Sequence, residues 1–196
     1  GHGASEIGKE KTPMSMPIDA YFATLGALPG RVRCHDGDGA EFSLGESIGR
    51  FVALAQGTHE AGNKLIFIGN GGSAGIASHM AIDYSKNGNI RSQAFNDSSA
   101  LTCLGNDLGY ENVFSKQIEL HARPDDLLVA ISSSGNSENI LNGVDQARVS
   151  DCKVITLSGF GEDNRLRGRG DINFYVPSQE YGFVEITHLA LCHAVV

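Results

Sequence analysis

The sequence lacks any hydrophobic run that approaches the ~20 residues of a membrane-spanning helix. Its first segment, Gly1 to Lys11, is polar and has no apolar core of the kind that a signal peptide carries. The chain also lacks an excess of positive charge, because 15 Lys and Arg against 23 Asp and Glu give a net charge of −8. These absences argue against a membrane protein and against a surface that holds nucleic acid. We expect a cytoplasmic protein.

Cysteine is also sparse. The four cysteines are scattered and form no Cys-x-x-Cys pair, at Cys34, Cys103, Cys152 and Cys192. This argues against a disulfide framework and against a cysteine-based zinc site, and we expect buried, reduced thiols in a reducing cytosol. The remaining composition, 41% hydrophobic and 19% charged residues in a chain of 196, is that of a globular protein with one substantial core.

Short apolar runs alternate with helical patterns from residue 64 onward. Ser43 and Glu46 form a capping box at the start of a helix that extends to about residue 60. Strands are predicted over residues 65–68, 127–131, 154–157 and 172–176, with a weaker one over 92–95. Continuous apolar strands that alternate with helices predict an α/β fold with a parallel sheet covered on both faces.

Two regions follow from this pattern. Residues 43–196 are expected to form the α/β domain, and residues 1–42 a partly helical N-terminal extension. The last helix, over residues 183–196, is apolar almost all round. Such a helix is expected to be buried in the core or against another subunit.

A glycine-rich turn follows the first predicted strand directly, as Gly69-Asn70-Gly71-Gly72-Ser73-Ala74-Gly75. In a parallel sheet this turn lies at the carboxyl end, where ligands bind, and the next helix offers free N–H groups to an anion. Gly69, Gly71 and Ala74 match the dinucleotide-binding pattern G-x-G-x-x-A. Asp97 follows the next strand, where an acidic residue would bind the ribose of a dinucleotide. A phosphorylated sugar and a plain packing turn are the alternatives, whereas the P-loop motif is missing.

A serine-rich loop, Ser132-Ser133-Ser134-Gly135-Asn136-Ser137, follows the strand over 127–131 and opens a helix over 138–148. Several hydroxyl and N–H groups at a positive helix end suit a phosphate monoester. A dinucleotide fold does not need this second anion-binding turn, so the loop favours a phosphorylated sugar. Serine-rich turns are also common as simple helix caps, and this alternative stays open.

Three motifs follow one another along the chain: Gly69 to Ser73, Gly105-Asn106-Asp107 and Ile131 to Ser137. By these motifs and their order, the chain resembles the SIS (sugar isomerase) domain family and, within it, the phosphoheptose isomerases. The resemblance covers about residues 43–193. It implies a flavodoxin-like three-layer sandwich, a homotetramer with active sites between subunits, and conversion of sedoheptulose 7-phosphate to D-glycero-D-manno-heptose 7-phosphate. It further implies that the serine loop holds the phosphate through Ser132, Ser133, Ser134 and Ser137. The sugar would contact Asn70, Gly71, Gly72, Ser73, Asp83, Asn106, Asp107 and Glu185.

Two pairs of residues have the spacing of metal ligands. His79 and Asp83 are four residues apart on one helix face, and Glu185 and His193 are eight apart on the last helix. Two imidazoles and two carboxylates would suit zinc if these helices converge. A helix salt bridge or a simple polar contact explains each pair equally well.

The resemblance implies one zinc ion per subunit, bound by His79, Asp83, Glu185 and His193. The family ligands are His, Glu, Gln and His, so Asp83 is one methylene shorter and Glu185 replaces a neutral amide by an anion. The added charge predicts tighter binding of a divalent metal. We expect Asp83 and His193 to be the catalytic acid–base pair. His188, one turn beyond Glu185, is expected to be structural.

Two other functions stay open. Some SIS proteins related to the phosphoheptose isomerases are tetrameric adaptors that bind the replication initiator protein, and these lack the acid that corresponds to Asp83. The presence of that acid and of both histidines favours an enzyme. The departures at Asp83 and Glu185 keep open an isomerase or a sensor for a different sugar phosphate.

Overall fold

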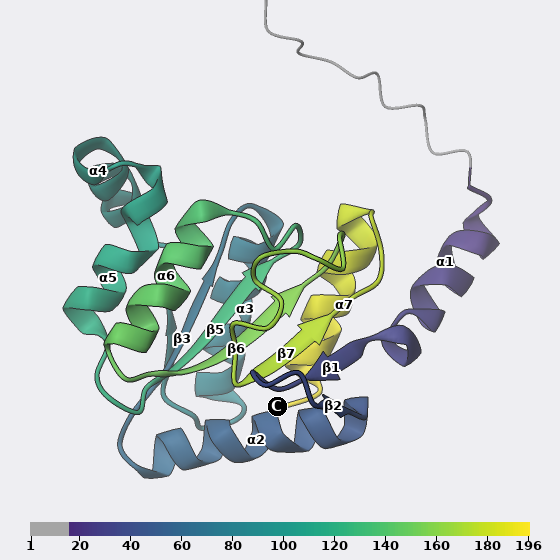
Figure 1. Ribbon diagram of the computed structural model, residues 1–196, viewed down its shortest axis with the longest axis horizontal. Coiled ribbons are helices and arrows are strands. Elements are labelled where there is room, and N and C mark those ends of the chain that lie inside the picture. Colours follow the sequence, from purple (N-terminus) through teal and green to yellow (C-terminus); the bar gives the residue numbers. More distant parts are fainter. Residues whose placement is uncertain (1–15) are drawn as a thin grey trace, which may run out of the picture.

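The computed structural model describes residues 16–196, and the polar segment Gly1 to Lys11 lies outside the described residues. The chain folds as three layers, with one sheet between two layers of helices (Figure 1). The strands are β1 (Arg33–His35), β2 (Glu41–Phe42), β3 (Leu65–Gly69), β4 (Ser92–Ala94), β5 (Leu127–Ser132), β6 (Lys153–Ser158) and β7 (Ile172–Tyr175). The α-helices are α1 (Ile18–Ala27), α2 (Leu44–Glu60), α3 (Gly72–Lys86), α4 (Ser98–Leu108), α5 (Val113–His121), α6 (Glu138–Val149) and α7 (Tyr181–His193).

The sheet has the order β2-β1-β7-β6-β5-β3-β4. The five strands from β7 to β4 run parallel, which confirms the predicted α/β architecture. The chain passes from β3 outward to β4 and then returns to β5 on the other side of β3. The carboxyl ends of β3 and β5 therefore form the crevice at which the winding direction reverses, where ligands bind in open α/β sheets.

Two short antiparallel strands, β1 and β2, extend the sheet beyond β7 and were not predicted from the sequence. They lie between residues 33 and 42, which we assigned to the N-terminal extension. Arg33 and Glu41 are exposed, and neither strand has an apolar run. β1 pairs with β7, which is distant in the sequence, and β2 joins the sheet only through β1.

Alternate residues of the buried strands pack into two cores. Leu65 and Phe67 of β3 face α2, α3 and α7, while Ile66 and Ile68 face α5 and α6. All the residues of β3 and β5 are buried, as continuous apolar runs predict. Each such side chain contributes about 1.5–3 kcal/mol on burial, so these strands hold the turns that follow them in place.

The start of α2 follows the predicted signal, and the last helix packs on the core. Ser43 Oγ accepts a hydrogen bond from the Glu46 N–H at 3.2 Å and caps α2. We expected the helix over residues 183–196 to be buried in the core or against another subunit. α7 packs on the sheet and α3 but leaves Tyr181 (60%) and Ile186 (42%) exposed, so burial against another subunit stays a prediction. Tyr21 of α1 stacks on Phe183 at 4.9 Å between ring centroids.

Three of the four cysteines fit the expectation of buried, reduced thiols. Cys34, Cys152 and Cys192 are free and buried, whereas Cys103 is exposed on α4 and departs from it. Burial raises the pKa of the Cys152 thiol to about 11 and that of Cys192 to about 12, which keeps both unreactive. Within residues 16–196, the structure has no helix that is both long and apolar enough to cross a membrane.

Candidate active site

The glycine-rich turn lies at the carboxyl end of β3 and begins α3. Gly71 has a φ of 54°, a conformation that L-residues rarely adopt, and it caps the helix without a side chain. A Cβ atom on Gly72 would overlap the carboxylate of Glu185, so glycine lets α7 approach the turn closely.

The serine loop lies beside this turn, at the carboxyl end of β5 and before α6. Together they line a cavity of about 240 Å³. Its residues are Asn70, Gly71, Gly72, Ser73, Ser132, Ser133, Ser134, Ser137, Tyr181 and Glu185. The structure thus brings together most of the residues predicted to bind the substrate. Tyr181 was not predicted, because its role depends on how α7 docks.

Two serines of this loop differ in their hydrogen bonding. Ser132 Oγ accepts from the Gly135 N–H at 3.2 Å and holds the loop closed. Ser133 Oγ is buried without a hydrogen-bond partner, although such groups are normally satisfied. Ser133 also lines the cavity. A hydroxyl without a partner in the loop that leads to a helix N-terminus is a candidate donor to a phosphate oxygen.

A network of amides fixes Asn70 in the glycine-rich turn. Asn70 Nδ2 donates to Asn139 Oδ1 at 2.8 Å, and Asn139 Nδ2 donates to Asn70 Oδ1 at 2.9 Å. The hydroxyl of Tyr110 donates to the same Asn70 oxygen at 2.9 Å. Asn139 is buried at the start of α6, so the amide of Asn70 is held in one orientation at the edge of the cavity.

Three of the four predicted metal ligands converge. His79 Nε2 lies 3.1 Å and His193 Nδ1 3.7 Å from Asp83 Oδ2. One ligand atom from each of these residues lies within 4.8 Å of the others. Their convergence results from the packing of α3 against α7. Two imidazoles and one carboxylate match a catalytic zinc site, which has three protein ligands and an open position.

Glu185, the fourth predicted ligand, is placed differently. Its carboxylate lies against Gly72 and lines the cavity between the glycine-rich turn and the serine loop. Among the described residues, the group with metal-binding geometry consists of the other three. Glu185 lies on α7 two turns before His193, so it connects the cavity with the histidine cluster along one helix. Its role as a ligand stays a prediction.

Asn106 and Asp107 lie on α4, outside the residues that line the cavity. Asn106 Nδ2 donates to Asp107 Oδ1 at 2.7 Å, and both side chains are partly or fully exposed. Their predicted contact with the sugar stays a prediction. His188 is fully buried, and its Nε2 lies 3.1 Å from the carbonyl oxygen of Ser158. Burial lowers the pKa of His188 to about 4, so its imidazole is neutral at pH 7, which agrees with the structural role expected for it.

Comparison with known proteins gives the same assignment. Residues 41–159 match the SIS domain family. The phosphoheptose isomerase of Akkermansia muciniphila is 36% identical over 159 residues, which cover 78% of this chain and 84% of that protein. The chain belongs to the phosphoheptose isomerase family. The phosphoheptose isomerase of Geobacter sp. (strain M21) is 31% identical over 171 residues, which cover 84% of this chain and 88% of that protein.

Solved phosphoheptose isomerases share the fold. The structure from Neisseria gonorrhoeae has a TM-score of 0.78 at 31% identity and covers 91% of this chain and 94% of its own. That from Francisella tularensis has a TM-score of 0.77 at 27% identity, covering 91% and 93%. These findings confirm the predicted fold and family. A phosphoheptose isomerase is a sugar-phosphate isomerase, so the aldose–ketose class is confirmed and the dinucleotide alternative is set aside.

Proposed function

We propose that this chain converts sedoheptulose 7-phosphate to D-glycero-D-manno-heptose 7-phosphate. The observation that carries this proposal is that α3 and α7 each contribute both to the serine-lined cavity, through Gly72 and Glu185, and to the cluster of His79, Asp83 and His193. Aldose–ketose isomerisation moves a proton between two adjacent carbons through an enediol. It requires an acid–base pair at the reacting carbons and an anchor for the distant phosphate.

The serine loop is the anchor in this proposal. Ser133 Oγ and the free N–H groups at the start of α6 would bind the phosphate, while Asn70 would orient the sugar. Binding energy from the phosphate then positions the reacting carbons at the far end of the cavity. Tyr181, which lines the same cavity, would cover the bound sugar.

The cluster on α3 and α7 supplies the acid and the base. His193 and Asp83 would move the proton between the two adjacent carbons as an acid–base pair, through ring or carboxylate atoms that do not hold the metal. Asp83 Oδ2 lies 3.7 Å from His193 Nδ1, so the two groups are close enough to act together. His79, Asp83 and His193, with Glu185 as fourth ligand, would hold one zinc ion. When bound, zinc supplies Lewis-acid polarisation of the substrate carbonyl.

We also propose a cytoplasmic homotetramer in which the active site lies between subunits. His79 and His193 have side-chain exposures of 54% and 45%, which is high for groups that act in a water-excluded site. On the same two helices, Ile82 (59%) and Ile186 (42%) are exposed. A neighbouring subunit that covers these side chains would bury the isoleucines and close the site.

The test is isomerisation of sedoheptulose 7-phosphate by the purified full chain, with zinc added and after chelation. The proposal expects formation of the heptose 7-phosphate that zinc restores after chelation, and loss of turnover in His193→Ala without loss of fold. Light scattering during size-exclusion chromatography measures the oligomeric state in parallel. The control is His59→Ala, which removes a histidine far from the cavity.

Failure would take distinct forms. A folded, zinc-loaded tetramer that leaves sedoheptulose 7-phosphate unchanged but isomerises another sugar phosphate would overturn the substrate assignment. A tetramer that binds no zinc and isomerises none would overturn the enzyme assignment in favour of an adaptor or a sensor. Normal turnover by His193→Ala would overturn the acid–base assignment alone.

A further inference from the structure

Basic side chains gather at the amino end of the sheet, opposite the proposed active site. Lys64 precedes β3, Arg91 precedes β4, and Arg123 follows α5. The amino and carboxyl ends of β3 are about 17 Å apart, at about 3.3 Å per residue over five residues. The basic cluster is therefore a different place from the serine loop and does not depend on the proposed function.

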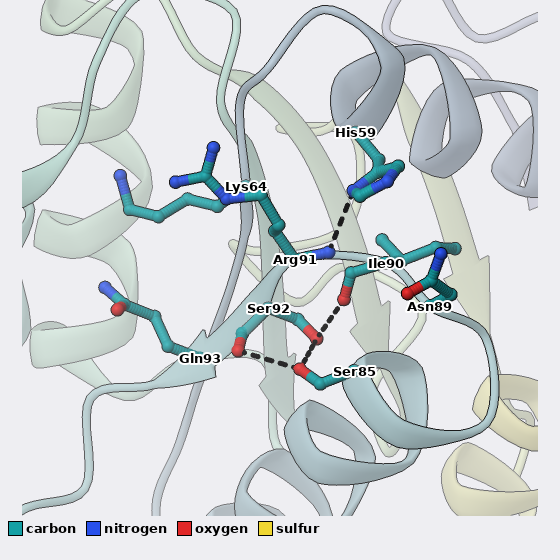
Figure 2. A pocket seen from close by; sticks show the side chains of 8 residues that line it. All are labelled: His59, Lys64, Ser85, Asn89, Ile90, Arg91, Ser92 and Gln93. Carbon is teal, nitrogen blue, oxygen red and sulfur yellow. Dashed lines mark hydrogen bonds between the residues drawn. The ribbon is translucent and has the colours of Figure 1, made fainter.

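Two adjoining cavities lie at this end and share Lys64 and Arg91. The larger, of about 350 Å³, is lined also by His59, Ser85, Asn89, Ile90, Ser92 and Gln93 (Figure 2). The smaller, of about 200 Å³, is lined also by Gly62, Asn63, His121, Arg123 and Asp126. Figure 2 shows the guanidinium of Arg91, the ammonium of Lys64 and the amide of Gln93 on one side of β4, with His59 and Asn89 on the other.

The arginines here lack the acidic partners that arginines have elsewhere in the molecule. Six of the nine arginines pair with a carboxylate, namely Arg33, Arg50, Arg148, Arg165, Arg167 and Arg169. Within residues 16–196, the three without such a pair are Arg31, Arg91 and Arg123. Two of these three line the smaller cavity. In a chain of net charge −8, this concentration of unpaired positive charge is a specific local feature.

Asp126 is the single acidic residue that lines either cavity, and its charge is already compensated, so it would not repel an anion. Asp126 is buried, and its carboxylate accepts hydrogen bonds from the Lys64 ammonium at 2.6 Å, the Lys64 N–H at 2.9 Å and the Arg123 N–H at 2.9 Å. Lys64 and Asp126 therefore neutralise each other. The charges of Arg91 and Arg123 remain, which leaves the cavity with about two positive charges.

The donors are partly fixed before any ligand binds. One guanidinium nitrogen of Arg91 donates to the carbonyl oxygen of Gly62 at 2.6 Å, which leaves its other N–H groups available. The ammonium of Lys64 is held by the carbonyl oxygen of His121 at 2.8 Å. A guanidinium whose direction is fixed loses less entropy when it binds, and its planar fork matches the oxygens of a phosphate.

We propose that Arg91, Arg123 and Lys64 form a second anion site that binds the phosphate group of a small molecule. The shared chemistry is a tetrahedral dianion, whether free phosphate or a phosphate monoester. Arg91 and Arg123 hold its oxygens from two sides and supply the positive charge, and the ammonium of Lys64, whose charge Asp126 neutralises, offers a further N–H donor. The site lies at the amino ends of the strands and the serine loop at their carboxyl ends, so both can be occupied together.

The experiment is calorimetric titration of the full chain with inorganic phosphate and, separately, with glycerol 3-phosphate. A background variant, Ser134→Asp, places a carboxylate in the serine loop so that phosphate is repelled there and the second site is read alone. In this background we expect one phosphate per chain, with an affinity that falls as the NaCl concentration rises. Adding Arg123→Gln should weaken binding by about tenfold.

Matched variants separate binding from fold. The Arg123 guanidinium makes no hydrogen bond in the described chain, so Arg123→Gln should keep the fold. Arg91→Gln should weaken binding as well, whereas Arg31→Gln, the third unpaired arginine, should leave it unchanged. A preference for glycerol 3-phosphate would identify a phosphorylated metabolite as occupant, and equal binding would identify free phosphate. Absence of binding in the Ser134→Asp background, or equal binding by Arg123→Gln and Arg31→Gln, would overturn the proposal.

Discussion

Asn70 and Asn139 exchange two side-chain hydrogen bonds, at 2.8 and 2.9 Å, across the crevice between β3 and β5. We predict that Asn139→Ala raises KM several-fold and destabilises the fold by about 1–3 kcal/mol, because it leaves the amide of Asn70 without its buried partner. Steady-state kinetics with the heptulose phosphate and urea unfolding measure the two effects. Asn139 touches no substrate in the proposal, so it positions Asn70 and does not act on the reacting atoms.

The control for this variant is Gln146→Ala. Gln146 lies two turns further along α6, and its amide donates to Ser150 Oγ at 3.3 Å, away from the cavity. It should leave KM unchanged. If Asn139→Ala loses stability but keeps the KM of the wild type, the pair is structural and does not orient the substrate.

A second prediction concerns Gly72, against which the Glu185 carboxylate packs. Gly72→Ala would place a methyl group on that carboxylate and push the end of the Glu185 side chain away by about 1 Å. We expect a loss in kcat/KM of about 100-fold, since misplacement of this size disrupts the alignment of catalytic groups. Zinc content and turnover measure the change.

Gly75→Ala is the matched control in the same helix. A Cβ atom there meets nothing within 4 Å, and alanine should stabilise α3 by up to about 1 kcal/mol. Equal kcat/KM in the Gly72 and Gly75 variants would show that the close approach of Glu185 does not matter for catalysis.

The parts of the fold and site that the sequence predicts are those set by local residues. The strands follow from continuous apolar runs such as Leu65 to Ile68, and the anion-binding turns follow from glycines and serines at strand ends. The cluster of His79, Asp83 and His193 was predicted from the family resemblance and from helix spacing. Its geometry needed the packing of α3 on α7, which no spacing specifies.

The features that sequence reasoning missed depend on contacts between distant residues. β1 pairs with β7, which lies more than 130 residues away, and β2 joins the sheet only through β1. Tyr110 reaches Asn70 only because the chain between β4 and β5 folds back over the crevice. The sequence does not indicate a role for Asn139, because asparagine is common near the first turn of helices for reasons unrelated to ligand binding. Arg91 and Arg123 likewise become a cluster only in three dimensions.

A third prediction follows from His188, whose imidazole is fully buried. Burial lowers its pKa from 6.5 to about 4, so the unfolded chain takes up a proton near pH 6.5 while the folded chain does not. The contribution of His188 to stability is therefore complete above pH 6.5 and is lost as the pH falls toward 4. Between pH 7.5 and pH 5 the loss amounts to about 2 kcal/mol.

Urea unfolding of the chelated protein across this pH range checks the prediction. His188→Gln keeps a donor for the Ser158 carbonyl and removes the titrating group, so its free energy of unfolding should fall less steeply with decreasing pH. His59→Gln changes a histidine on α2 whose Nδ1 accepts the Arg91 N–H, and it should keep the slope of the wild type. Identical slopes for His188→Gln and the wild type would contradict a buried neutral imidazole.

The last prediction compares alanine variants of two neighbouring serines, Ser132 and Ser133. Ser133→Ala removes a buried hydroxyl that has no partner in the ligand-free chain, so the fold should keep or slightly gain stability. The same change should raise KM for the phosphorylated sugar about tenfold, because a hydrogen bond to a charged phosphate is lost. Ser132→Ala should instead lower the free energy of unfolding by about 1 kcal/mol, because Ser132 Oγ accepts a hydrogen bond from the Gly135 N–H. Thermal unfolding and kinetics on both variants measure this contrast, and a Ser133→Ala protein that is destabilised with an unchanged KM would show that its hydroxyl serves the fold instead of the phosphate.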